Sequence, residues 1–203
     1  MHSIEDMYTL VQSVAEKKQL SQTREALPYM NMCHQGQVRD GKDRVPYIYH
    51  PLKMCCHALA MGIDDDEILA TILVHDVCED CGKTTQELPV SKKVKEAVGF
   101  LSFYVLEGKT IEESKQIYYN NISKNKIAML VKVIDRCNNL STMAAAFDKA
   151  RMIRYINETE QYILPLLCEI EEKYPEFESV VFLVRYHILS VLETLTRTIR
   201  VHE

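Results

Sequence analysis

Apolar residues recur at helical spacing along most of the chain, and helix-start signals such as Thr110 with Glu113 precede several of these runs. The pattern predicts helices near residues 3–18, 21–34, 50–62, 64–80, 91–106, 110–121, 124–147, 148–172 and 176–200. The charged stretch 35–49 lacks this period and predicts a loop. Pro51 fits the first turn of the helix after it, which places His50 at the helix entrance. The sequence therefore predicts an all-α fold.

Composition supports that fold and a single domain. The 203 residues include only 6 Gly and 6 Pro, so few tight turns and hairpins can form. With 47% hydrophobic and 26% charged residues the chain resembles an average soluble protein, and it shows no internal repeat or low-complexity linker. We expect one domain over residues 1–203.

Net charge and cysteine content narrow the class of partner and the cellular compartment that we expect. The 24 basic and 29 acidic residues give a net charge of −5, which argues against a nucleic acid polymer as partner. The chain has an odd number of cysteines, 7, and its N-terminus lacks the features of a secretory signal. Together these observations predict reduced thiols and a cytoplasmic protein. The apolar stretch 180–192 contains Arg185 and His187 and is short for a bilayer, so we expect no membrane segment. The pattern leaves the oligomeric state open.

The first candidate for chemistry is the segment 64–80, DDDEILATILVHDVCED, where ionisable residues follow an apolar run. At about 100° per residue, His75, Asp76, Glu79 and Asp80 fall within an arc of roughly 140° on one helical face. Adjacent His and Asp can bind a divalent metal, and carboxylates one turn further can handle protons. The alternative is a helix end with solvated charges.

In a second segment, 127–142, an apolar run leads into Asp135. Asn139 and Thr142 lie on the same stripe of the predicted helix as Asp135. Such a stripe suits a metal ligand followed by groups that hold a polar substrate, although on its own it also fits an ordinary helix surface. Together with His50 and His75-Asp76, it predicts a site of two imidazoles and two carboxylates for Mn(II), Fe(II), Zn(II) or another divalent ion.

The order of these residues resembles the HD phosphohydrolase superfamily, an all-α helical bundle with its metal site in a central cleft. The surrounding motifs resemble one branch of it, the guanosine tetraphosphate (ppGpp) 3′-pyrophosphohydrolase domain of the Rel/Spo family, including its single-domain small alarmone hydrolases. The matching motifs are His34-x-Gly36-Gln37-x-Arg39, Pro46-Tyr47-Ile48-x-His50-Pro51, His75-Asp76-x-x-Glu79-Asp80, Asp135-Arg136-x-x-Asn139-Leu140-x-Thr142 and Arg154-Tyr155-Ile156-Asn157-Glu158-Thr159, within a core of about residues 34–159.

The resemblance implies a metal-dependent hydrolysis of ppGpp, a small nucleotide, to GDP and pyrophosphate. His50, His75, Asp76 and Asp135 would bind one metal, most often Mn(II) in that family, and Glu79 and Asp80 would activate water and manage protons. Arg39 would lie against the guanine, and Asn139 and Thr142 would hold the nucleotide. The chain length implies a hydrolase without the synthetase and regulatory domains of the long members.

The sequence departs from the family at the loop before Pro46-Tyr47, which is about two residues longer. Asp40 stands where the family commonly has Lys, and Lys42 and Arg44 are the candidates for the missing cation. The departure keeps open another HD-type nucleotide phosphohydrolase or nucleotidase. A non-catalytic nucleotide-sensing protein is a third hypothesis, disfavoured because buried acids without a metal are costly.

Three further features have two interpretations each. Cys78-x-x-Cys81 and the pair Cys55-Cys56 fit small buried side chains better than a structural zinc or redox pair, since no second C-x-x-C exists. His34 is expected to hold its loop rather than to contact phosphate. Tyr47 either packs beneath the nucleotide or fills the core, and the sequence does not decide between these roles.

Overall fold

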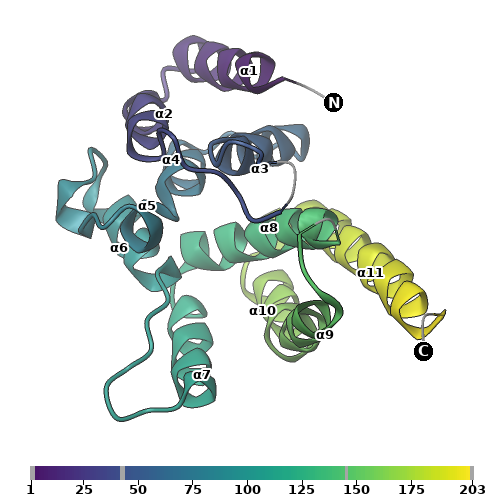
Figure 1. Cartoon of the computed structure of the whole chain (residues 1–203). Coiled ribbons are helices and arrows are strands. Elements are labelled where there is room, and N and C mark those ends of the chain that lie inside the picture. The colour runs from purple at the N-terminus through teal and green to yellow at the C-terminus, as the bar shows by residue number, and fades with distance from the viewer. Residues whose placement is uncertain (1–2, 42–43, 145, 202–203) are drawn as a thin grey trace. The chain divides into compact units, whose positions relative to one another are not determined.

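The computed structural model describes residues 3–41, 44–144 and 146–201, and the regular elements in these ranges are all helices (Figure 1). The predicted all-α fold is therefore confirmed. The chain divides into two compact units, Met1–Gln37 with Pro46–Lys132, and Val38–Val45 with Val133–Glu203. The expectation of one domain stays a prediction, and each unit is described in turn.

The first unit is built around a buried helix, α4 (Asp66–Val74), in which every residue from Ile68 to Val74 is buried. Helix α2 (Ser21–Cys33) packs along it and buries Leu27 and Met30. Asp66 joins the two helices, because its carboxylate accepts bonds from the Gln22 and Thr23 amides at the start of α2, at 3.0 and 2.8 Å. The other elements of this unit are α1 (Ile4–Lys17), α3 (Tyr49–Ala60), α5 (Val77–Asp80), η1 (Thr85–Glu87), α6 (Lys92–Leu101), α7 (Ile111–Ile122) and the first half of α8 (Lys126–Met143).

Local sequence explains where several of these helices begin. Thr110 and Glu113 form a capping box, in which each side chain bonds the other's backbone amide, and Ser3 and Asp6 do the same for α1. These are two of the start signals present in the sequence, and both helices begin at the next residue.

The single helix expected over 64–80 is wrong, because the chain breaks between α4 and α5 at His75 and Asp76. The His75 imidazole bonds the Ile72 carbonyl through Nδ1 at 2.8 Å. In a continuous helix that carbonyl would accept the amide of Asp76 four residues later, so the side chain competes with the helix ladder. His75, Asp76, Glu79 and Asp80 therefore do not share one straight helical face.

The helix expected over 91–106 ends earlier, at Leu101. The apolar pattern continues through Tyr104, Val105 and Leu106, but these side chains are 58%, 54% and 40% exposed and pack into no core. Residues 102–109 form a loop instead, closed by Gly108 with a φ of 72°, a conformation that favours glycine.

The second unit continues α8 and adds α9 (Lys149–Glu158), η2 (Thr159–Ile163), α10 (Leu164–Lys173), η3 (Pro175–Phe177) and α11 (Glu178–Val201). The predicted helix over 148–172 is present, but its centre, η2, is a π-helical turn. Pro165 is the second residue after that turn. Because proline has no N–H and crowds the carbonyl four residues before it, the α-helical ladder cannot continue there unaltered.

The closing helix corrects one part of the sequence analysis. Among the described residues, Pro175–Ile199 is long and apolar enough to cross a bilayer by length and composition, a longer segment than the apolar stretch 180–192. One third of its most apolar window, 33%, is buried inside the protein. Core helices pass the same test, so the expectation of no membrane partner stays a prediction.

Candidate metal centre and surrounding residues

Three of the predicted metal ligands lie together in the first unit. His50 lies at the start of α3, and His75 and Asp76 form the break after α4. The Asp76 Oδ2 atom is 3.6 Å from His50 Nε2 and 3.0 Å from His75 Nε2, and one ligand atom of each residue lies within 4.8 Å of the others. Both imidazoles are buried, with 2% and 4% of the side chain exposed, whereas Asp76 is 24% exposed.

The hydrogen bond that breaks the helix also sets the tautomer of His75. The Ile72 carbonyl can only accept a bond, so Nδ1 carries a proton, and in the neutral imidazole Nε2 is the nitrogen left to bind a metal. A backbone carbonyl in this place is the usual partner of a metal-bound imidazole. Two imidazoles and a carboxylate form a donor set that suits a borderline divalent metal, so these residues fit the ion that the sequence predicts.

Tyr47 links this cluster to the loop that precedes it. Its hydroxyl donates to Asp76 Oδ2 at 2.6 Å, and its ring stacks on His34 with centroids 4.5 Å apart. His34 Nδ1 donates in turn to Gln37 Oε1 at 2.7 Å. These contacts give Tyr47 a third role, beyond the two that the sequence suggested, as a donor to a predicted ligand, and they show His34 holding its loop.

Glu79 and Asp80 follow the cluster on the short helix α5. Glu79 lies at the surface, and its Oε2 accepts a bond from the Phe103 amide at 3.0 Å. Partial burial of the carboxylate raises the pKa of Glu79, while the Phe103 hydrogen bond opposes that rise. The Asp80 backbone is fixed at both ends, because its amide donates to the Asp76 carbonyl at 2.8 Å and its carbonyl accepts from Gln37 Nε2 at 3.3 Å.

Three other predicted site residues form a chain within the second unit. Arg39 Nη2 donates to Asn139 Oδ1 at 2.5 Å, and Asn139 Nδ2 donates to Asp135 Oδ1 at 2.6 Å. Asn139 thus uses its carbonyl and its amide group to connect a guanidinium with a buried carboxylate. The structure brings these three together as a set, and the role of Asp135 as fourth metal ligand stays a prediction.

The roles of the remaining predicted substrate-binding residues, Thr142 and Lys42, stay predictions. The Thr142 hydroxyl donates to carbonyls of its own helix, Asn138 at 3.4 Å and Asn139 at 3.2 Å. Lys42 lies outside the described residues. Asp40 pairs with Arg151 Nη1 at 2.9 Å, and both side chains are largely exposed. Sequence reasoning did not identify Arg151 as the cation that offsets Asp40.

The segment 154–159 resembles the family, but the resemblance assigned it no role. In the structure two of its side chains contact Arg136, the residue after Asp135. The Arg136 side chain is 2% exposed and pairs with Glu158, and its guanidinium lies 3.7 Å from the centroid of the Tyr155 ring. A buried guanidinium needs both a counter-charge and a flat partner, and Glu158 and Tyr155 provide them.

The cysteines behave as buried thiols. Cys55 and Cys78 are buried and Cys56 and Cys81 half-buried, and all of them are unbridged. Burial raises the pKa of the Cys81 thiol to about 11, and that of Cys55 also rises well above its usual value, which disfavours reactive thiolates.

Sequence reasoning missed Phe103 and Lys132, which act on Glu79, and Tyr118, which contacts both of them. Phe103 acts through its main-chain amide, for which no side-chain pattern exists. Lys132 offered a signal, because it interrupts the apolar run 127–134.

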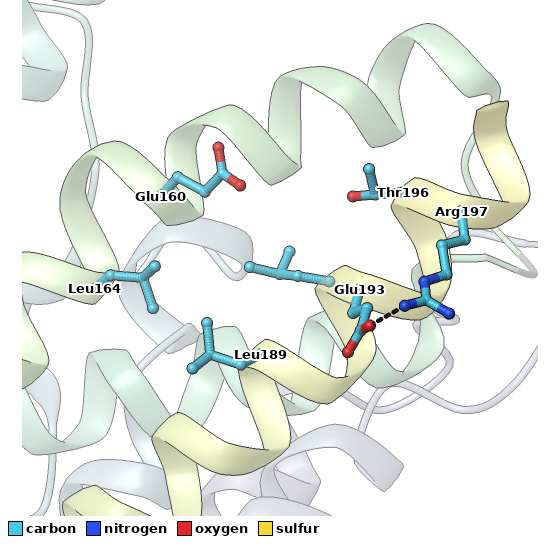
Figure 2. Close-up of a pocket in the computed structure, with 7 residues that line it drawn as sticks. Glu160, Leu164, Leu189, Glu193, Thr196 and Arg197 are labelled. Atoms are coloured by element: carbon cyan, nitrogen blue, oxygen red, sulfur yellow. Dashed lines mark hydrogen bonds and ion pairs between the residues drawn. The ribbon is translucent and has the colours of Figure 1, made fainter.

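A groove lies in the second unit, with a volume of about 390 Å³ (Figure 2). Its lining consists of Leu164, Leu189 and Leu192 with the polar residues Glu160, Glu193, Thr196 and Arg197. Figure 2 shows the ion pair between Glu193 and Arg197 at one side of the groove. None of the predicted metal ligands or proton-transfer residues lines this groove.

Comparisons with known proteins agree with the resemblance seen in the sequence. No family model matches the chain. The bifunctional (p)ppGpp synthase/hydrolase SpoT of Escherichia coli strain K12 is 30% identical over 176 residues, 82% of this chain and 24% of that protein. The guanosine-3′,5′-bis(diphosphate) 3′-pyrophosphohydrolase of Haemophilus influenzae is 30% identical over 185 residues, 83% of this chain and 26% of that protein. The chain thus spans about a quarter of the length of these curated relatives.

A solved structure shares the fold. It is described as a metazoan ortholog of SpoT that hydrolyzes ppGpp, and it matches with a TM-score of 0.65 at 19% identity, covering 88% of this chain and 95% of that chain. This likeness shows the fold alone, and it agrees with the all-α fold predicted from the sequence.

Proposed function

We propose that this chain, a relative of the Rel/Spo proteins, is a metal-dependent phosphohydrolase that cleaves ppGpp to GDP and pyrophosphate. The observation that carries the proposal is the cluster of His50, His75 and Asp76, with two buried imidazoles facing one carboxylate oxygen. The names of the curated relatives supply the substrate. We propose Mn(II) as the metal and Asp135 as its fourth protein ligand.

The chain's own residues account for the parts of the reaction other than the metal. A divalent ion held by the His-Asp cluster would lower the pKa of a water molecule and offset the charge of the diphosphate. Glu79, whose pKa partial burial raises above its usual range, is proposed to accept a proton from the attacking water. Asp80 is proposed to manage the proton at the 3′-oxygen, which leaves as a hydroxyl when its bond to phosphorus breaks.

Substrate binding is proposed for the second unit's chain of residues. Arg39 would lie against the guanine, Asn139 and Thr142 would hold the nucleotide, and Lys42 would contribute a positive charge. The bond between Arg39 and Asn139 supports this set, because it fixes the guanidinium in one orientation before a ligand arrives. The partner is thus a small nucleotide, and a cytoplasmic location is proposed with it.

The test is phosphorus NMR of the products formed from ppGpp by the purified chain with Mn(II), beside GTP, ATP and deoxynucleotide monophosphates. Pyrophosphate and GDP from ppGpp alone are expected, and Asp76→Ala serves as the blank because it removes a ligand. Glu79→Ala should keep Mn(II) and lose turnover. Full activity of Glu79→Ala would contradict the role given to that carboxylate.

A second candidate is another HD-type nucleotide phosphohydrolase or nucleotidase with a different substrate. Asp40 is the observation that favours it, because a carboxylate beside Arg39 opposes a highly charged nucleotide. The pairing of Asp40 with Arg151 offsets that charge, so ppGpp remains the preferred candidate substrate. Phosphate released from another nucleotide, with ppGpp untouched, would decide for the second candidate.

A further inference from the structure

A side chain of α7 bonds the backbone at the point where α6 ends and the following loop begins. The carbonyl of Leu101, the last helical residue, accepts a bond from the Tyr118 hydroxyl of α7 at 2.7 Å. Carbonyls in the last turn of a helix lack a helical partner, so a side-chain donor fixes both that group and the direction of the chain beyond it. At Ser102 the backbone turns into an extended conformation, with φ −79° and ψ 117°.

The next amide along the loop, that of Phe103, bonds the proposed catalytic base, Glu79. Phe103 N–H donates to Glu79 Oε2 at 3.0 Å, and the Phe103 ring packs edge-on against the Tyr118 ring with centroids 5.4 Å apart. Tyr118 therefore contacts the chain on both sides of this amide, the carbonyl of residue 101 before it and the ring of residue 103 after it.

The same tyrosine also contacts a cation that acts on Glu79. Lys132 Nζ lies 5.4 Å from the centre of the Tyr118 ring, within the range of a cation–π contact. The charge of Lys132 lowers the pKa of Glu79, whereas the charges of Asp76 and Asp80 raise it. Tyr118 thus contacts two of the groups that act on the Glu79 carboxylate, Phe103 and Lys132.

We propose that Tyr118 is a positioning residue for Glu79: its hydroxyl and ring hold the backbone at 101–103, so that the Phe103 amide fixes the carboxylate that takes the proton from water. The inference rests on the proposed function for its catalytic consequence. A carboxylate at the surface has several rotamers, and a single well-directed amide selects one of them.

The first test needs no activity and uses amide hydrogen exchange at Phe103 in the full-length chain. Tyr118→Phe removes the hydroxyl and keeps the ring, so the fold should persist. We expect exchange at the Phe103 amide to be at least about tenfold faster in Tyr118→Phe and in Glu79→Ala, because each variant loosens or removes this bond. Tyr104→Phe, in the same loop but exposed, is the matched control and should leave the rate unchanged.

The second test separates positioning from a general structural effect. With ppGpp and Mn(II), Tyr118→Phe should lower kcat by about tenfold with KM and Mn(II) affinity within about twofold, because only the proton acceptor is displaced. Glu79→Ala is expected to retain only a residual kcat, and in that background the same substitution should cause no further loss, since its target is absent.

Two results would overturn the proposal: unchanged Phe103 exchange in Tyr118→Phe, or an equal loss of kcat with and without Glu79. A wild-type chain that leaves ppGpp intact would refute the proposed function instead, and the exchange measurement would still decide whether Tyr118 holds the Phe103 amide. The two failures are therefore distinguishable.

Discussion

Tyr47→Phe should weaken metal binding while leaving the three ligands in place. The substitution removes one oxygen, the donor to Asp76 Oδ2 at 2.6 Å, and keeps the ring that stacks on His34. A hydrogen bond to a charged group contributes about 1.5–3 kcal/mol, and each 1.4 kcal/mol corresponds to about a tenfold change in affinity. Loss of a partner behind a metal ligand commonly costs about 10- to 100-fold. We therefore expect the Kd for Mn(II) to rise by about 10- to 100-fold.

The assay is a Mn(II) titration followed by the electron paramagnetic resonance signal of the free ion, which requires no substrate. Tyr49→Phe, two residues further along, is the control. Burial and the neighbouring Asp76 charge raise the pKa of Tyr47 well above its usual value, so its hydroxyl stays a donor across the working range. The difference between variant and wild type should therefore be equal at about pH 7 and about pH 9. A Kd within about twofold of wild type would refute the idea that Tyr47 orients the ligand.

Three other substitutions test the surrounding structure. Glu158→Ala removes the carboxylate that pairs with the buried Arg136 and should lower the free energy of unfolding in urea by about 3 kcal/mol. Glu160→Ala, at an exposed neighbouring position, should change it little, and equal effects of the two substitutions would contradict the role of the ion pair. Burial lowers the pKa of His34, so the unfolded chain binds more protons than the folded chain as the pH drops below about 6.5, and the free energy of unfolding falls. His34→Gln should lose part of this pH dependence, which urea unfolding at two pH values measures. Asn139→Ala should raise KM for ppGpp by about tenfold or more, and an unchanged KM would remove Asn139 from the binding site.

Periodicity and capping signals in the sequence predicted most helices to within a few residues, because local pattern and tertiary packing agree there. They failed at His75, where the imidazole competes with the backbone for the Ile72 carbonyl, and at residues 102–106, where apolar side chains continue the pattern without being buried. No periodicity rule describes either event.

The candidate site shows a similar division. The order of the motifs in the sequence was enough to group His50, His75 and Asp76, and in the structure their ligand atoms lie close enough to hold one ion. The sequence did not identify the role of Tyr47, because a tyrosine three residues before a histidine fits a core position equally well. It also missed Arg151 beside Asp40, since those residues are far apart in the chain and paired through the fold.

The break after α4 has a consequence for how this protein can change over generations. His75 is proposed as a metal ligand and also lies where the helix ends, since its Nε2 faces Asp76 and its Nδ1 bonds the Ile72 carbonyl. We expect a replacement that cannot bond that carbonyl to disturb the backbone at the break, and with it the position of Asp76 as well as that of residue 75. The two positions cannot drift independently, and an engineered metal swap at position 75 must preserve the backbone bond as well as the donor atom.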